Sequence, residues 1–218
     1  NEEQFHIPSH LQGGYNRGPG TALLSKISKI SVKKAAGHTA RKLGQWVDRK
    51  IVKQPGIYFL NQKFELTECI SPQKLPKGHY LLFLHGVLSN FENSFDHLIQ
   101  STDNTKEKFR KEYDSNIIGF QHHTVSDSPL QNVIDFLKGV EKGCSFDIIS
   151  FSRGGLVSDI LTRCDHRNQE CLFSEEEIKV YRKNIEEDGS KDGKTHLLLK
   201  EINKLSLSKE IEIRKCFR

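Results

Sequence analysis

The stretch FDIISFSRGGLVSDIL, Phe146 to Leu161, contains the pattern that decides the fold. Its first five residues, FDIIS, form the short apolar run expected of a buried strand. From Arg153 to Arg163 the apolar residues recur at helical spacing. Ser152 and a pair of glycines lie where the two patterns meet. The sequence therefore predicts a strand, then a tight turn that carries a serine, then a helix.

Ser152 has the sequence neighbours that a nucleophile needs. A sharp strand-to-helix turn strains the backbone of its central residue and lifts that side chain above the sheet. Strand and helix approach closely there, so the residues two positions to either side must be small, and here they are Ser150 and Gly154, followed by Gly155. This S-x-S-x-G-G pattern is one residue away from the G-x-S-x-G nucleophile elbow. The positive end of the helix dipole and the backbone N–H of Arg153 suit a developing oxyanion.

The loop FLHGVLSN (83–90) is placed to supply a second oxyanion donor. It follows the apolar run YLLFL, which we expect to be a strand buried on both faces. Gly86 permits an unusual turn after His85. The N–H of Val87 can then point into the same pocket as the serine, so the sequence predicts an oxyanion hole made by two backbone groups.

The rest of the chain alternates between strand-like and helix-like segments. Six segments have the pattern of strands, the first two as a hairpin: 57–60, 63–69, 80–84, 116–121, 146–150 and 211–217. Helices are expected between the later strands: within 93–112, at 129–141, at 153–163 and around 198–205. A hairpin followed by strand–helix alternation predicts an α/β fold, with a mostly parallel sheet flanked by helices. Ligands of such sheets bind at the carboxyl ends of the strands, where Ser152 and His85 fall.

Composition describes a soluble globular protein. The chain has 218 residues, of which 35% are hydrophobic and 28% charged. No apolar run approaches the ~20 residues of a membrane span, and no signal peptide opens the chain. Its five cysteines form no C-x-x-C motif, so we expect free thiols in a reducing, cytoplasmic setting. Cys164, His166 and Cys171 match no common zinc spacing, and we expect no metal and no other cofactor.

A strongly basic segment precedes the strands. Residues 17–53 hold ten Lys/Arg and a single acid, Asp48, which gives a local charge of +9 in a chain whose total is +5. An apolar stripe recurs every four residues in its last part: Leu43, Val47 and Ile51, with Trp46 beside them. Such a helix can pack on the body through this stripe and Trp46, or it can bind an anionic surface such as lipid or nucleic acid. The sequence leaves both alternatives open.

Several segments resemble the α/β-hydrolase superfamily on its lipase-like side, and most closely the α/β-hydrolase-like domain of bacterial proteins that also carry caspase-like CHAT peptidase domains. They are PGIYFL (55–60), LLFLHGVLSNFENSF (81–95), IIGFQHHTVSDSPLQNVIDFL (117–137) and FDIISFSRGGLVSDIL (146–161). The resemblance implies the hydrolase fold, a Ser152 nucleophile and an oxyanion hole from Val87 and Arg153. It divides the chain into a basic helical segment at 1–54 and a hydrolase-like domain at 55–218, with a charged insertion at 167–195.

The partners of the serine are the main departure from that family's pattern. Its triad follows the chain order Ser, acid, His, with the acid and the His on loops after later strands. His166 ends the helix after Ser152 and His196 begins the next one, so neither lies where the fold places its base. We therefore expect the acid and the base outside this chain, and interpret the domain as its first two-thirds, truncated after the sixth strand. His122 and His123 follow the fourth strand, and we expect them to line the pocket or stabilise its turns.

Two classes of function fit these observations. The first is a serine hydrolase of the esterase or lipase type, which would act on a small-molecule or lipid ester through an acyl-enzyme. The second is a non-catalytic, hydrolase-like module used for recognition or regulation beside an effector or peptidase domain. A fold does not fix a function, so the resemblance does not choose between them.

Overall fold

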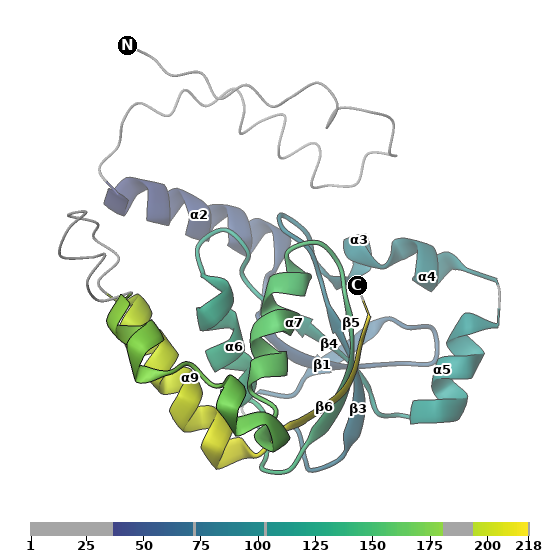
Figure 1. The fold of residues 1–218 in the computed structure, drawn as a ribbon. Coiled ribbons are helices and arrows are strands. Elements are labelled where there is room, and N and C mark those ends of the chain that lie inside the picture. The colour runs from purple at the N-terminus through teal and green to yellow at the C-terminus, as the bar shows by residue number, and fades with distance from the viewer. Residues whose placement is uncertain (1–36, 72, 103, 181–193, 218) are drawn as a thin grey trace.

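Six strands form one sheet in the order β2-β1-β4-β3-β5-β6 (Figure 1). The computed structural model describes residues 37–71, 73–102, 104–180 and 194–217. The strands span β1 Gly56–Leu60, β2 Leu66–Cys69, β3 His79–Leu84, β4 Ile117–Gln121, β5 Ser145–Ser150 and β6 Glu212–Phe217. β1 pairs antiparallel with β2 and β4, whereas β3 is parallel to β4 and β5, and β5 is parallel to β6. The predicted α/β fold with a mostly parallel sheet is confirmed.

Helices cover both faces of this sheet (Figure 1). Their bounds are α2 Gly37–Ile51, α3 Phe91–Ser94, α4 Asp96–Gln100, α5 Thr105–Tyr113, α6 Pro129–Lys138, α7 Gly154–Arg163 and α9 Thr195–Lys209. The charged insertion is described in part, as a 3₁₀ helix at His166–Cys171 and a helical stretch at 175–180, while 181–193 lie outside the described residues. α6, α7 and α9 pack on one face, and α3, α4 and α5 lie on the other (Figure 1).

Alternation along β3 explains why the core has two layers. Leu82 and Leu84 belong to the larger cluster, with residues of α6, α7 and α9. Leu81 and Phe83 point the other way, into an aromatic cluster with Phe91 and other residues of α3 to α5. Neighbouring side chains of a strand point to opposite faces, so an uninterrupted apolar run is what a sheet covered on both sides requires.

The region expected to hold a helix within 93–112 contains three short helices instead. Asn90 ends the preceding loop and caps α3, because its side-chain oxygen accepts the Asn93 N–H at 2.9 Å. Phe95 then leaves helical geometry (φ −122°, ψ 21°) between α3 and α4. This break lets the rings of Phe91 and Phe95 both pack edge-on against Phe83, at 5.7 and 5.0 Å between centroids. Tertiary packing of the aromatic rings thus overrides helix continuity.

The second strand begins at Leu66, later than the predicted start at Lys63. Phe64 has φ +62° and is fully buried, so the chain turns there to place its ring in the core. The side-chain oxygen of Asn61 accepts the N–H groups of Lys63 and Glu65 at 2.9 and 3.0 Å. The turn therefore takes up residues that the apolar pattern assigned to the strand.

Helix α2 packs on the body, but not through Trp46. Val47 is 3% exposed, whereas Trp46 is 47% exposed with the Lys50 ammonium 5.9 Å from its ring centroid. The expectation that Trp46 is a packing residue was therefore wrong, because the buried face is turned toward Val47 and Asp48. The basic residues at 17–36 lie outside the described residues. No helix in the described ranges is long and apolar enough to cross a membrane.

The strand order brings three loops together at one edge. β3 lies between β4 and β5. The chain therefore passes from β3 to β4 on one side of β3, and then crosses to β5 on its other side. Parallel strands end at the same edge, and a crevice opens outside their carboxyl ends where the direction of winding changes. The loops after β3, β4 and β5 meet there, and they contain His85, His122 and Ser152 respectively.

Candidate functional site

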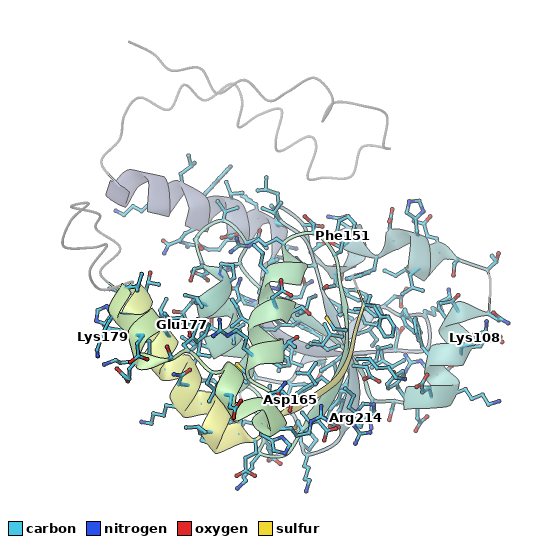
Figure 2. The ribbon with its side chains drawn as sticks, viewed as in Figure 1. Lys108, Phe151, Asp165, Glu177, Lys179 and Arg214 are labelled. Atoms are coloured by element: carbon cyan, nitrogen blue, oxygen red, sulfur yellow. The ribbon has the colours of Figure 1, made fainter. Side chains whose placement is uncertain are left out.

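Ser152 lies on a tight turn between β5 and α7, as the sequence predicts. Its φ is +53°, a left-handed conformation that costs a non-glycine residue free energy. The turn is closed by hydrogen bonds from the Gly154 N–H to the Phe151 carbonyl and from the Gly155 N–H to the Ser152 carbonyl, both at 2.9 Å. The serine is exposed to solvent. The strained turn thus presents this side chain at the carboxyl edge of the sheet (Figure 2 labels the adjacent Phe151).

Close approach of the helix to β3 explains the glycine two residues later. A Cβ on Gly154 would lie 2.3 Å from the carbonyl oxygen of Leu84, so only glycine fits. Gly155 has room, since the nearest atom to its Cβ would be Ser150 Oγ at 4.0 Å. Ser150 is buried and donates from Oγ to the Phe217 carbonyl at 3.2 Å. The small residues before and after Ser152 thus let the strand and the helix approach closely at this turn.

The loop after β3 lies directly against this turn. A Cβ on Gly86 would come within 3.0 Å of the Phe151 ring and 3.2 Å of Ser152 Cβ. The Gly86 N–H donates to Ser94 Oγ at 3.1 Å, and Leu88 has φ +51°. Gly86 thus allows the loop to contact the serine turn. The next peptide group, which carries the Val87 N–H, therefore lies beside this turn.

His85 fixes the orientation of that peptide. Its Nε2 accepts the His122 N–H at 3.1 Å, so Nδ1 carries the proton and donates to the Gly86 carbonyl at 3.0 Å. In a trans peptide the C=O and the N–H point in opposite directions. The bond from His85 therefore directs the Val87 N–H away from its own ring. Neither this N–H nor the Arg153 N–H has a hydrogen-bond partner among the residues that the structure describes.

The His85 ring is held neutral. Burial lowers the pKa of His85 to about 4, and burial lowers the pKa of His122 well below its usual value. The two rings stack at 4.1 Å between centroids, and His122 also stacks on Phe120 at 5.2 Å. A neutral His85 keeps one donor and one acceptor, which is what its two hydrogen bonds require.

Acidic pH should therefore lower the stability of the folded protein, because burial keeps His85 neutral. In the unfolded chain a histidine binds its proton near pH 6.5, but His85 does so only near pH 4 in the folded protein, so stability is full above pH 6.5 and falls as pH drops toward 4. Between pH 7.5 and 5 we expect His85 to account for a loss of about 2 kcal/mol, and His122 to act in the same direction. Urea unfolding at both pH values measures the loss. His85→Gln, which does not titrate, should show a smaller loss, and an equal loss in both proteins contradicts this assignment.

His122 and His123 line a cavity to which the serine turn contributes no residue. It has a volume of 410 Å³ and lies between α6, the start of β1 and the end of β4, and Ser152 is not among its lining residues. His123 Nδ1 is 3.4 Å from the Asp127 carboxylate. The two histidines thus line a cavity other than the expected one at Ser152, and the structure does not bring them to the Ser152 hydroxyl.

His79 and His166 have hydrogen-bond partners of their own. His79 contacts Ser145 Oγ at 2.9 Å and Asp147 Oδ2 at 3.2 Å, at the opposite edge of the sheet. His166 Nδ1 donates to the Ile211 carbonyl at 2.9 Å. Within the described ranges, no group of three or more His, Cys, Asp or Glu could hold a metal ion.

Asp48 is the residue of the site that sequence reasoning missed. It lies on α2, is 1% exposed, and accepts backbone N–H groups from the loop after β4. A signal was present, since Asp48 is the single acid among ten bases and is next to Val47 of the apolar stripe. An acid at a buried helical position needs donors, and these come from a loop far away in sequence.

Comparison with known proteins places the chain in one family. A family model described as "Domain of unknown function (DUF7379)" matches residues 53–180, from the second residue after α2 to the middle of the insertion. No curated protein and no solved structure matches the chain.

Proposed function

Because the chain belongs to the DUF7379 family of domains of unknown function, we propose its function from the site itself: serine hydrolase chemistry of the esterase or lipase type at Ser152. The single observation that supports this most is the strained turn that exposes Ser152 beside two backbone N–H groups, neither of which has a partner among the described residues. Strain of this kind persists where the surrounding structure enforces it, and it is concentrated at functional sites. The resemblance to the α/β-hydrolase superfamily agrees with the proposal.

The proposed reaction is acyl transfer to Ser152. Its Oγ attacks the ester carbonyl while a histidine takes the hydroxyl proton, and the N–H groups of Val87 and Arg153 stabilise the oxyanion. The C–O bond to the alcohol breaks, and the alcohol leaves with the proton from the histidine. Water then releases the acid from the acyl-enzyme by the same sequence. Arg153 precedes α7 directly, so its N–H is one of the donors that a helix leaves unpaired.

In this proposal the acid and the histidine of the triad come from outside this chain. The described histidines near the edge have other tasks: His85 joins two loops, His122 is buried and stacked, and His123 contacts Asp127. The Ser152 hydroxyl makes no hydrogen bond to any described residue. It is therefore open to a base and a substrate.

Apolar side chains around the turn favour a substrate with an acyl chain. Val87, Val125, Phe151 and Leu156 are each about half exposed, and they come from the three loops and the first turn of α7. Large apolar side chains that gather at a site mark a binding surface more often than scattered ones do. The basic face of α2 adds Lys42, Arg49 and Lys50, which suit an anionic surface near the site.

Hydrolysis of activated esters tests the proposal. In the intact polypeptide, p-nitrophenyl esters of short and medium chain length should be hydrolysed, and Ser152→Ala should lower kcat at least about 1,000-fold. Ser208→Ala, a change at an exposed serine of α9, serves as the matched control and should have no effect. Equal hydrolysis by wild type and Ser152→Ala overturns the proposal. Wild-type protein that is folded but inactive on every ester points instead to the recognition module.

A further inference from the structure

A carboxylate from outside the matched family domain is built into the edge that holds Ser152. Asp48 of α2 accepts the N–H groups of three successive residues: Thr124 at 2.9 Å, Val125 at 3.1 and 3.2 Å, and Ser126 at 2.7 Å. Both carboxylate oxygens take part. Hydrogen bonds to a buried charge are the strong ones, and without Asp48 three donors of one loop would lose their partner.

The loop at residues 124–127, which Asp48 holds, makes hydrogen bonds to both segments that carry the candidate oxyanion donors. Thr124 Oγ1 accepts the N–H of Leu88, the residue after Val87, at 3.0 Å. On the other side, the Asp127 carbonyl accepts a hydrogen bond from the Arg153 guanidinium at 2.5 Å. One loop of the chain therefore connects the segment after β3 with the turn after β5.

We propose that α2 contributes to the site through Asp48. Asp48 is a positioning residue, which orients the Val87 and Arg153 N–H groups through the 124–127 loop. The inference rests on the proposed function, since it concerns the oxyanion donors of that reaction. Asp48 does not touch the substrate; it acts through Thr124 and Asp127.

The packing of α2 supports this role. A Cβ on Gly44 would lie 3.3 Å from Val125 Cγ1, so the helix backbone rests directly on the loop. Val47 and Val52 are buried beside Asp48. The matched family model begins at residue 53, after the end of α2. The loop is thus organised by an element that precedes the domain, and displacement of α2 would release both donor segments together.

Asp48→Asn is the direct test, because it keeps the shape of the side chain but replaces one acceptor oxygen with a donor that faces N–H groups. Phosphonylation of Ser152 by a fluorophosphonate, in the intact polypeptide, separates the reversible binding constant of the probe from its bond-forming rate. We expect the rate to fall about 10- to 100-fold with the binding constant unchanged. Hydrogen exchange should quicken at the amides of Thr124, Val125, Ser126 and Leu88.

Two further variants keep the test decisive if Asp48→Asn folds poorly. Thr124→Val removes only the acceptor for the Leu88 N–H and should also slow phosphonylation, with exchange quickened at Leu88 and not at Ser126. Ile202→Val removes one buried methyl group from α9, which carries none of the proposed site residues, and should lower the melting temperature but not the phosphonylation rate.

The outcomes separate this inference from the proposed function. If wild-type protein is phosphonylated at Ser152 and both Asp48→Asn and Thr124→Val react as fast as wild type, the positioning role is overturned and the proposed function stands. A rate that falls in proportion to lost stability in all three variants, Ile202→Val included, also overturns it. Folded wild-type protein that is not phosphonylated at all overturns the proposed function, and the positioning role with it.

Discussion

Gly154→Ala should be among the most damaging single substitutions in the chain. Its Cβ would lie 2.3 Å from the Leu84 carbonyl oxygen and 3.0 Å from that of His85. These atoms belong to the central strand and the loop after it, so they cannot move aside as a flexible side chain can. We expect a loss of about 3 kcal/mol or more in the free energy of unfolding, measured by urea denaturation.

Gly155→Ala is the matched control, one position along the same helix. Its Cβ would meet no atom closer than 4.0 Å, and alanine is the better helix former. We expect the variant to be as stable as wild type or more stable by up to about 1 kcal/mol. Equal effects of the two substitutions would show that α7 does not approach β3 as described.

Phe83→Ala should have a comparable effect through the core. Phe83 is 1% exposed, and four aromatic rings pack edge-on around it at centroid distances of 5.0 to 6.3 Å: Phe64, Phe91, Phe95 and Phe109. Removal of the ring leaves a cavity that this rigid cluster cannot fill. We expect a loss of about 3–5 kcal/mol in the free energy of unfolding.

Phe151→Ala provides the comparison for that loss. Phe151 is 54% exposed at the serine turn, so its removal leaves no closed cavity (Figure 2). We expect a change below about 1 kcal/mol. If Phe83→Ala costs no more than Phe151→Ala, the aromatic cluster on the α3–α5 face is not the core that the structure describes.

Local pattern predicts the tight turn at Ser152 well because each requirement of that turn is local. The buried run FDIIS, the glycine at 154 and the helical spacing after it all act within a few residues of Ser152, and the structure has the predicted turn, with a positive φ at Ser152. The same holds for the loop after β3, where Gly86 is the residue that lets two backbones meet. The parallel direction of β3, β4 and β5 then follows from alternation, since parallel strands need helical crossovers.

Tertiary contacts decide the parts that local pattern could not predict. The break at Phe95 depends on Phe83, and the turn at Phe64 depends on Asn61, so neither is visible in helical or strand periodicity. The orientation of α2 depends on the donors that Asp48 finds in residues 124–126, which lie more than seventy positions away. The apolar stripe located the helix correctly, but the buried carboxylate turned Trp46 toward solvent.

Covalent labelling of the intact polypeptide by a fluorophosphonate, followed by peptide mapping in a mass spectrometer, tests the central claim most directly. An activated serine Oγ attacks the phosphorus of the reagent and displaces fluoride, which leaves a stable phosphonyl adduct on that serine. The account predicts a single adduct, on the peptide that contains Ser152, and none in folded Ser152→Ala. A folded protein without an adduct, or an adduct on another residue while Ser152 remains unmodified, would contradict it.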